Sequence, residues 1–284
     1  MRLMDCHTHT QFSVDSEADI DLCVKRAAEL GLDAYAITDH CECNGWYKKE
    51  HYPEDTWYLC ESFDYAADFE GSVTAVTALK EKWADKLNLI CGVELGQILH
   101  DKEVAKIVNA DRRVDFIIGS VHQVRGEQDF YFIDYEKMSM DEIYDLLERY
   151  FKEACEVSIT GLFDVFGHIT YCLRYMKQRH GICHDISRFD DIIAETFRNL
   201  AQNGKGIEIN TSGLRQGFGD CFPNLKYAKL FRDMGGEIVT VGSDSHTVED
   251  IAANSAEGIA LAKAAGFERL AYFKKRKPYF IDID

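Results

Sequence analysis

Short apolar runs, many of them rich in β-branched residues, recur along the chain and predict seven β-strands. The bounds of these strands are 3–6, 34–38, 89–93, 116–121, 163–166, 206–209 and 238–241. Runs such as 116–121 are almost continuously apolar, which suits a sheet that is covered on both faces. The hydrophobic pattern therefore predicts parallel strands in the interior of the protein.

Amphipathic stretches with recognisable starts lie between the apolar runs. Ser16 precedes an acidic turn that leads into apolar residues at helical spacing, and Ser139 with Glu142 forms a capping box. Further helices are expected near Ser72 and at 188–200, 226–234 and 255–265. Strands that alternate with helices imply right-handed crossovers in an α/β protein. Seven such units form either a closed barrel or an open sheet.

The composition is that of a globular protein, and we expect one domain that spans residues 1–284. No run of about 18 apolar residues is present, and the first residues lack the apolar stretch of a signal peptide. We therefore expect a cytoplasmic protein with no membrane partner. The formal net charge of −17 also disfavours long nucleic acids as partners.

Two local features have ordinary explanations. The chain has ten cysteines, but a chain of this length can build a core without disulfides, so we expect free and mostly buried thiols. The basic cluster 274–277 is expected to be a solvated surface patch.

The segment 41–70 interrupts the alternation of strands and helices. It is rich in aromatic and charged residues and follows the carboxyl end of a predicted strand, where barrel enzymes carry their active sites. The segment is either a structural surface loop or a lid over a substrate, and we favour the lid.

Histidines and carboxylates gather at or just after the carboxyl ends of the predicted strands. In chain order they are His7, His9, Asp15, His40, Glu94, His122, His168, Asp244 and His246. The strand 206–209 is the one predicted strand that is followed by none of these residues. In a barrel these ends converge, and divalent cations relieve the cost of bringing imidazoles and carboxylates together. The pattern therefore predicts a metal centre.

The spacing of the histidines indicates which metals fit. His7 and His9 are two residues apart, so on a strand both imidazoles face the same side and can bind one ion. Asp244 and His246 repeat this spacing. A ligand set of nitrogen and oxygen atoms without thiolate fits Zn²⁺, Mn²⁺ or Fe²⁺.

The motifs HTHT, TDH, GVE, GSVH, GH and SDSH occur in an order that resembles the PHP (polymerase and histidinol phosphatase) family of metal-dependent phosphoesterases. The start DCHTHTQFSVD and the segment EINTSGLR further resemble the histidinol-phosphatase branch of that family. The resemblance covers essentially the whole chain. It implies a distorted (β/α)7 TIM-like barrel with two or three metal ions.

The resemblance also implies a role for each ligand. His7, His9, Glu94 and Asp244 would hold the first ion; Glu94, His122 and His168 the second; Asp15, His40 and His246 the third. Asp15 stands where many members of the family have histidine. Glu94, Asp244 and His246 are the expected catalytic residues. Asp5 and Asp39 are expected to orient ligating histidines.

Substrate-binding residues are expected on the same face. Arg174 follows the fifth predicted strand and Arg215 the sixth, so we expect both to bind a substrate phosphate, together with Ser212. We expect a small phosphorylated substrate, hydrolysed by hydroxide held between two metal ions.

The resemblance implies hydrolysis of L-histidinol phosphate to L-histidinol and phosphate, a step of histidine biosynthesis. Two alternatives stay open. One is a PHP-type phosphatase or exonuclease that acts on sugar phosphates or short nucleotides, and the other is a non-catalytic metal-binding module. The sequence leaves the oligomeric state open.

Overall fold

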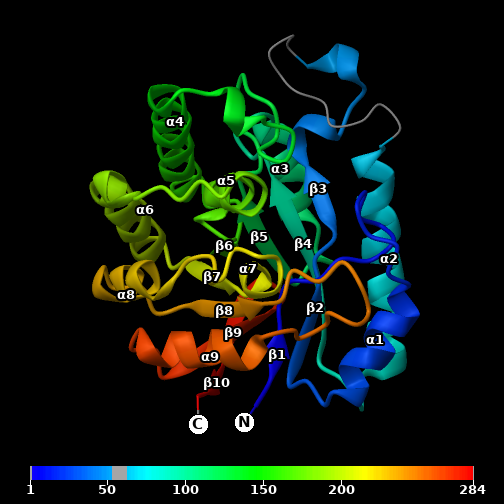
Figure 1. Ribbon diagram of the computed structural model, residues 1–284. Coiled ribbons are helices and arrows are strands. Elements are labelled where there is room, and N and C mark those ends of the chain that lie inside the picture. The colour runs from blue at the N-terminus through cyan, green and yellow to red at the C-terminus, as the bar shows by residue number, and fades with distance from the viewer. Residues whose placement is uncertain (1, 53–62, 284) are drawn as a thin grey trace.

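A parallel barrel forms the centre of the molecule, and its strand order follows the chain (Figure 1). The computed structural model describes residues 2–52 and 63–283. The strands run in the order β1-β2-β4-β5-β6-β7-β8, and β3 pairs with β4. Their bounds are β1 Met4–Asp5, β2 Ala34–Ile37, β3 His40–Glu42, β4 Leu89–Gly96, β5 Phe116–Ser120, β6 Val165–Phe166, β7 Gly206–Asn210 and β8 Val239–Gly242.

Backbone hydrogen bonds between the first and last strands nearly close this barrel. The amide of Cys6 donates to the carbonyl of Val241 (2.9 Å), and that of Asp244 donates to the carbonyl of His7 (2.8 Å). Every residue of β2, β4, β5, β7 and β8 is buried, because side chains fill the interior and helices cover the outside. The fold is therefore the predicted distorted (β/α)7 TIM-like barrel.

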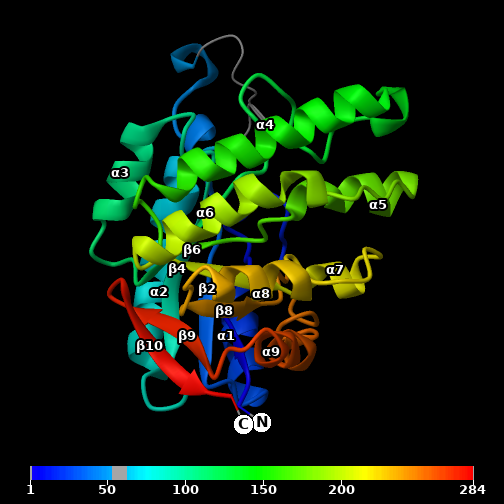
Figure 2. The same cartoon turned by 90° about the vertical axis from the view of Figure 1, so that its left-hand side faces the viewer.

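The helices lie around the outside of the strands, as the two views show (Figures 1 and 2). Their bounds are α1 Ile20–Glu29, α2 Tyr65–Trp83, α3 Lys102–Ala110, α4 Met140–Ser158, α5 Arg174–His180, α6 Asp190–Gln202, α7 Ser212–Arg215, α8 Leu225–Asp233 and α9 Ser255–Ala264. Among the described helices, none combines the length and the apolar character that a bilayer-spanning segment needs.

Local sequence signals account for most of the helix starts. The capping box of Ser139 and Glu142 begins α4, as predicted. The first helix differs, because its cap is Asp19 rather than Ser16, and Asp19 accepts the amide of Leu22. The hydroxyl of Ser16 instead donates to the carbonyl of His246 (3.0 Å). Residues 10–18 thus form a loop over the barrel.

All seven predicted strands are present, and the structure adds three. One is β3, which continues from the end of β2 and pairs in parallel with β4. The others are β9 Arg269–Lys274 and β10 Lys277–Asp282, which form an antiparallel hairpin. The nine cysteines in the described ranges are free thiols, and seven of them are buried, as expected.

The turn of the hairpin closes the amino-terminal end of the barrel. Arg276 forms an ion pair with Asp164, just before β6 (2.6 Å), and the amide of Lys275 donates to Asp115, just before β5 (2.9 Å). Residues 2–4 and 281–283 line one small cavity, so the two ends of the chain are neighbours there. The basic cluster 274–277 is thus not only the solvated patch that we predicted, because Arg276 holds the hairpin against the barrel.

Candidate metal centre

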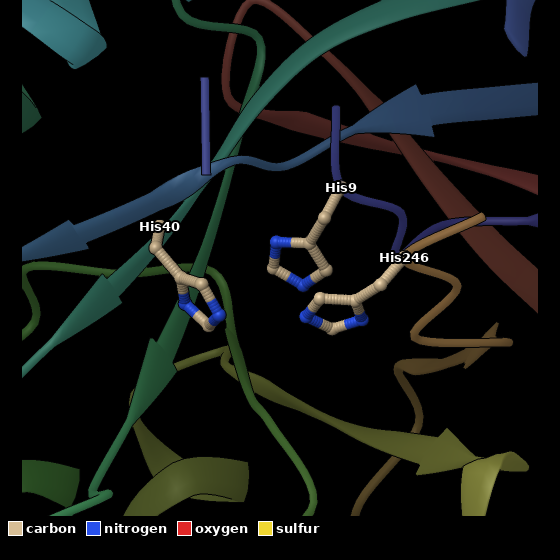
Figure 3. Close-up of side chains that lie close together, drawn as sticks. All are labelled: His9, His40 and His246. Atoms are coloured by element: carbon tan, nitrogen blue, oxygen red, sulfur yellow. The ribbon is translucent and has the colours of Figure 1, made fainter. Parts of the chain in front are cut away.

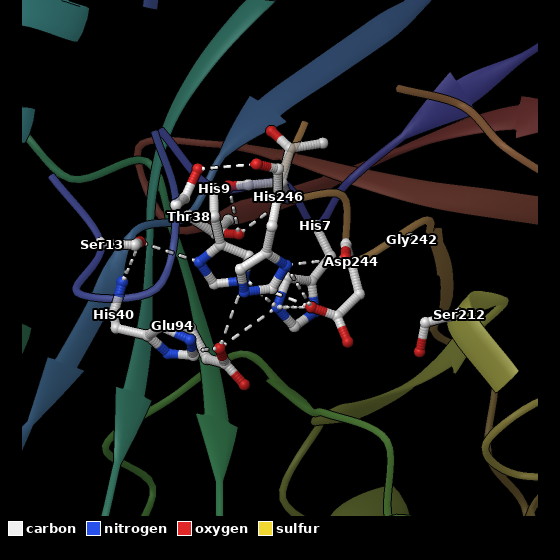
Figure 4. Close-up of polar contacts among 12 residues, drawn as sticks. His7, His9, Ser13, Thr38, His40, Glu94, Ser212, Gly242, Asp244 and His246 are labelled. Carbon is white, nitrogen blue, oxygen red and sulfur yellow. Dashed lines mark hydrogen bonds and ion pairs between the residues drawn. The ribbon is translucent and has the colours of Figure 1, made fainter. Parts of the chain in front are cut away.

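The carboxyl ends of the strands bring the nine predicted ligands to one side of the barrel, opposite the hairpin turn. At this end, four sets of three side chains have ligand atoms within 4.8 Å of one another. These sets are His7, His9 and Asp244; His7, Glu94 and His168; His40, Glu94 and His122; and His9, His40 and His246. Asp15 lies beside the last set. Figure 4 shows the convergence of His7, His9, His40, Glu94, Asp244 and His246.

Glu94, on β4, lies at the centre of the cluster and divides its two oxygens between two groups of histidines. Its Oε1 lies 3.0 Å from Nε2 of His122 and 2.7 Å from Nε2 of His168. Its Oε2 lies 3.2 Å from Nε2 of His7 and 2.9 Å from Nδ1 of His40. One carboxylate therefore faces two candidate ion positions.

The imidazole of His7 points its Nε2 atom toward that of His9, at 3.1 Å. Oδ1 of Asp244 lies 3.4 Å from Nε2 of His9 and 3.8 Å from that of His7. Two imidazoles on one tetrahedral zinc ion, each with a bond of about 2.0–2.1 Å, have nitrogens about 3.3 Å apart. The Nε2 atoms of His122 and His168 lie 3.4 Å apart, so they show the same geometry.

The carboxylate of Glu208, on β7, sets the orientation of the His7 ring. Its Oε1 lies 2.7 Å from Nδ1 of His7, and its Oε2 accepts the backbone amide of His168 (3.0 Å). A carboxylate on Nδ1 keeps the proton there and leaves the lone pair of Nε2 directed into the cluster. Glu208 is fully buried, so this contact has no competition from water.

Two further histidines have partners on Nδ1. Ser13 Oγ lies 2.9 Å from Nδ1 of His9, and Glu42 Oε1 lies 2.9 Å from Nδ1 of His122. Glu42 is on β3, two residues after His40, so the strand that the sequence did not predict supplies this contact. Three of the imidazoles therefore present Nε2 to the centre.

His9, His40 and His246 form a third group, in which the rings of His9 and His246 stack (Figure 3). The ring of His9 lies 4.2 Å from those of His40 and His246, measured between centroids. Asp15 spans the group: its Oδ1 is 3.5 Å from Nε2 of His40, and its Oδ2 is 3.2 Å from Nε2 of His246. The side chain of Asp15 is 54% exposed, which makes this the most solvent-accessible part of the cluster.

Asp39 and Asp5 hold the loops that carry the ligands and do not contact the histidine rings, which corrects their expected role. Asp39 accepts the amide of Thr10 (2.6 Å) and the hydroxyl of Ser13 (2.9 Å), so it acts on His9 through Ser13. Asp5 accepts the backbone amides at 243 (2.8 Å) and 252 (2.7 Å) and thus fixes the loop after β8. The direct partners, Glu42 and Glu208, were missed by the sequence reasoning.

A sequence signal for both missed glutamates exists in the alternation of side chains along a strand. Glu42 is two residues from His40, and Glu208 is two residues from Asn210, so each points to the same side as a polar neighbour. A charged residue inside a strand that is covered on both faces needs a partner in the interior.

The buried carboxylates of the cluster are ionised at neutral pH. Burial raises the pKa of Glu94, but the charges of His7, His122 and His40 outweigh burial and hold this pKa well below its usual range. Burial also raises the pKa of Asp244, and His7 is the first of the neighbours that bring it well below the usual range. Both side chains are therefore available as anionic ligands.

A pocket of about 340 Å³ opens from this cluster. At one end it is lined by ligands of the cluster, and its walls are mainly aromatic. The aromatic residues are Phe63, Tyr65, Tyr131, Phe132, Tyr171 and Tyr175. Residues 53–62 lie outside the described residues, so the predicted lid over 41–70 stays a prediction, although Phe63 and Tyr65 come from this segment.

Arg174 is at the junction of the pocket and the cluster. Its Nη1 lies 3.5 Å from Oδ2 of Asp244, and its guanidinium lies over the rings of Tyr171 (5.6 Å) and Tyr175 (5.7 Å). Its Nη2 lies 3.4 Å from the hydroxyl of Ser212. It is the one lysine or arginine among the described residues that line the pocket.

Arg215 and Ser212 do not line the pocket, and their contacts to a substrate phosphate stay a prediction. Arg215 donates to the carbonyl oxygens of Ser243 (2.5 Å) and Asp244 (2.8 Å), and its Nε lies 3.2 Å from Asp250. The hydroxyl of Ser212 donates to Asn210 (2.6 Å) and supports Arg174 from behind. Arg215 therefore holds the loop that carries Asp244.

The donor set fits divalent metal ions. Nitrogen and carboxylate oxygen atoms converge, and buried hydrogen bonds set the tautomers of His7, His9 and His122. Thiolates are absent from the four convergent sets found among the described residues at this end of the barrel. Such a set suits ions of borderline hardness.

Comparisons with known proteins agree with this geometry. The model of the PHP domain family matches residues 5–212. Histidinol-phosphatase of Lactococcus lactis subsp. lactis (strain IL1403) is 27% identical over 283 residues, which cover 98% of this chain and 96% of that protein. Histidinol-phosphatase of Saccharomyces cerevisiae (strain ATCC 204508 / S288c) is 23% identical over 288 residues, covering 86% of this chain and 83% of that protein.

Solved structures show the same fold. A crystal structure of histidinol phosphate phosphatase from Lactococcus lactis subsp. lactis Il1403, complexed with zinc, L-histidinol and phosphate, superposes with a TM-score of 0.75 at 24% identity. The superposition covers 98% of this chain and 99% of that one. The putative histidinol phosphatase of Listeria monocytogenes gives a TM-score of 0.72 at 21% identity and covers 89% of this chain and 99% of that one.

Proposed function

Because the chain belongs to the PHP domain family, we propose that it is a metal-dependent phosphatase that hydrolyses L-histidinol phosphate to L-histidinol and phosphate. The membership confirms the resemblance that the sequence motifs indicated. One observation carries the proposal: six histidines and three carboxylates converge at the end of an aromatic pocket, next to a buried arginine. The relatives that cover most of the chain are named histidinol-phosphatases, which supports the choice of substrate.

The cofactors are divalent metal ions, and their number and identity form part of the proposal. We assign the ligands of three ions as follows: His7, His9, Glu94 and Asp244; Glu94, His122 and His168; Asp15, His40 and His246. The division of the two Glu94 oxygens supports a bridge between the first two sets. Zinc, manganese and iron all suit nitrogen and oxygen ligands, and the Lactococcus lactis structure contains zinc.

Divalent ions in these sites lower the pKa of bound water and neutralise the charge of a phosphate ester, which is the chemistry that hydrolysis needs. Around them, the residues of the chain have distinct roles. Arg174 is directed at the pocket by Asp244 and two tyrosine rings, so its guanidinium binds and orients the phosphate oxygens. Oδ2 of Asp244 faces Arg174 and is placed to accept a proton from the attacking water.

The remaining catalytic assignment is His246, which lines the pocket and is 24% exposed in its side chain. Its Nδ1 lies 3.0 Å from the carbonyl oxygen of Asp244, so its Nε2 is the atom that faces Asp15. We assign it to the part of the site where the leaving group departs. The aromatic walls exclude water from the ester, which strengthens the ionic contacts.

The test compares substrates after the protein has been loaded with Zn²⁺, Mn²⁺ or Fe²⁺. We expect at least two ions per chain by elemental analysis. We also expect a kcat/KM for histidinol phosphate that is at least about tenfold higher than for sugar phosphates or nucleoside monophosphates, a difference of about 1.4 kcal/mol. Activity on all the esters without that preference would indicate a phosphatase that acts on other substrates. Metal content below one ion per chain, or no turnover of any ester, would overturn the proposal.

A further inference from the structure

Asp129 is a buried carboxylate in the wall of the pocket that forms no ion pair with the described residues, although the charges of His122 and His40 act on it from the metal cluster. It is 7% exposed and lines the pocket together with the metal ligands. Within residues 2–52 and 63–283, no lysine, arginine or histidine forms an ion pair with it. The segment 53–62 contains no lysine or arginine. A buried carboxylate without a counter-ion is costly, unless a ligand supplies the charge.

The loop after β5 holds this carboxylate toward the pocket. Oδ1 of Asp129 accepts the amide of Tyr131 (2.7 Å), and its backbone pairs with that of Gln123. Burial raises the pKa of Asp129 to about 6, and the charge of His122 opposes this rise. The backbone contacts leave the second oxygen, Oδ2, with no hydrogen bond among the described residues. The loop therefore presents one carboxylate oxygen for an incoming cation.

Tyr65 supplies a second unsatisfied polar group in the same wall. It is 2% exposed and lines the pocket, and its hydroxyl has no hydrogen-bond partner among the described residues. Gly45 lies against the ring so closely that a Cβ there would be 2.4 Å from it, which keeps the ring in place. A buried hydroxyl without a partner is rare in folded proteins. The hydroxyl is therefore available to a bound molecule.

Aromatic rings complete the environment of these two groups. Tyr131, Tyr171 and Tyr175 line the same pocket, and the ring of Tyr131 packs edge-on against that of Tyr175 (5.4 Å). Arg174 lies over the rings of Tyr171 and Tyr175, and Arg179 lies over those of Tyr131 and Tyr175, so these faces already have cations and the rings serve as an apolar wall. The pocket is polarised, because Arg174 and the metal ions that the cluster would hold are suited to an anion, whereas Asp129 is suited to a cation.

We propose that Asp129 binds the ammonium group of the leaving alcohol and that the Tyr65 hydroxyl hydrogen-bonds the same part of the substrate. This inference rests on the proposed function and identifies the residues that select its substrate. Asp129 lies on the loop after β5, whereas Tyr65 belongs to the segment 41–70.

The test changes the enzyme and the substrate together. Asp129→Asn removes the charge, yet its side-chain oxygen can still accept the amide of Tyr131, so the loop is preserved. The substrates are histidinol phosphate and the analogue that has hydrogen in place of the amine. For histidinol phosphate we expect kcat/KM to fall on the order of 10- to 150-fold, the range for a lost hydrogen bond to a charged group. The loss should be at least about tenfold smaller for the analogue.

Matched controls separate this selectivity from general damage. Asp134→Asn removes the same charge from a nearby surface position that does not line the pocket. It should leave the ratio of the kcat/KM values for histidinol phosphate and the analogue as in the wild type. Tyr65→Phe should lower kcat/KM for histidinol phosphate by less than Asp129→Asn does, because it removes a neutral hydrogen bond.

Three results would overturn the inference. Asp129→Asn could lower kcat/KM equally for both substrates, or for neither. Asp134→Asn could change the ratio of the two kcat/KM values as much as Asp129→Asn does. Failure of the proposed function looks different. In that case the wild-type enzyme itself would not prefer histidinol phosphate to sugar phosphates, whatever the variants do.

Discussion

Replacing Glu208 with glutamine tests how the barrel prepares a histidine for metal binding. The wild-type carboxylate makes three contacts, to Nδ1 of His7 (2.7 Å) through Oε1 and to the backbone amide of His168 (3.0 Å) and the side-chain amide of Asn210 (3.3 Å) through Oε2. A glutamine has one oxygen, so it can accept on the side of His7 or on the side of His168, but not on both. Its NH2 group then faces either the amide of His168, where two donors oppose each other, or Nδ1 of His7. The second arrangement places the proton of His7 on Nε2, where the lone pair for a metal is needed.

The expected loss follows from the position of this contact. Partners that orient a metal-binding histidine typically contribute 10- to 100-fold in affinity or activity, or about 1.4–2.7 kcal/mol. Glu208 is fully buried, so water cannot replace the lost acceptor, and we expect a value toward the upper end of that range. The loss should fall mainly on metal affinity, and saturating metal should restore part of kcat.

The measurement is a chelator competition titration for the metal, with kcat determined at saturating metal. Glu237→Gln is the matched control, because Glu237 is an exposed residue before β8, at the other end of the barrel. A metal affinity of Glu208→Gln within about threefold of the wild-type value would refute the argument that Glu208 sets the tautomer of His7. An equal loss in the control would show that net charge, rather than this contact, is responsible.

Three other substitutions have expected outcomes. Glu94→Gln should lower kcat by about 10³-fold or more and reduce metal content, because both of its oxygens face ligand groups; near-normal turnover at saturating metal would contradict the bridge. Gly242→Ala should lower metal affinity as assayed by chelator competition, because its Cβ would lie 2.4 Å from Oε1 of Glu208; unchanged affinity would show that the site relaxes easily. Arg276→Asn should lower the free energy of unfolding in urea by about 1.5–3 kcal/mol, since it breaks an ion pair that is 21% exposed on the arginine side. Lys275→Asn, at the neighbouring turn position, should cost much less, and equal costs would argue against the ion pair.

The hydrophobic pattern was sufficient to predict the strands that are continuous apolar runs, whereas the choice of a barrel over an open sheet came from the family resemblance. The strand β3 was missed because its three residues, His40–Glu42, include two charged or ionisable side chains and resemble the start of a loop. The hairpin β9–β10 was missed for a different reason. Its turn residues, Lys275 and Arg276, have positive φ angles of 49° and 64°, yet this conformation usually selects glycine or asparagine. Contacts to Asp115 and Asp164, distant in sequence, compensate for the missing turn signal.

The convergence of the candidate metal ligands could be predicted because the ends of parallel strands must meet, which makes position along the chain informative about position in space. The same reasoning placed Arg215 after β7 correctly but could not show where its side chain points. Its guanidinium binds two carbonyl oxygens of the loop after β8, and that contact depends on the path of both loops. The partners Glu42 and Glu208 are inside strands, so they resembled ordinary strand residues until the neighbours across the barrel were known.

The hairpin turn and the neighbouring ends of the chain lie at the amino-terminal end of the barrel, whereas the pocket opens at the carboxyl end of the strands. This separation has a practical consequence for attaching the protein to other materials. A surface, a dye or a fused protein joined near residue 2 or residue 283 would face away from the opening through which the substrate enters. Because those two ends line one cavity, a short linker could also join them, and new ends could then be opened in an exposed loop while the strands keep their order.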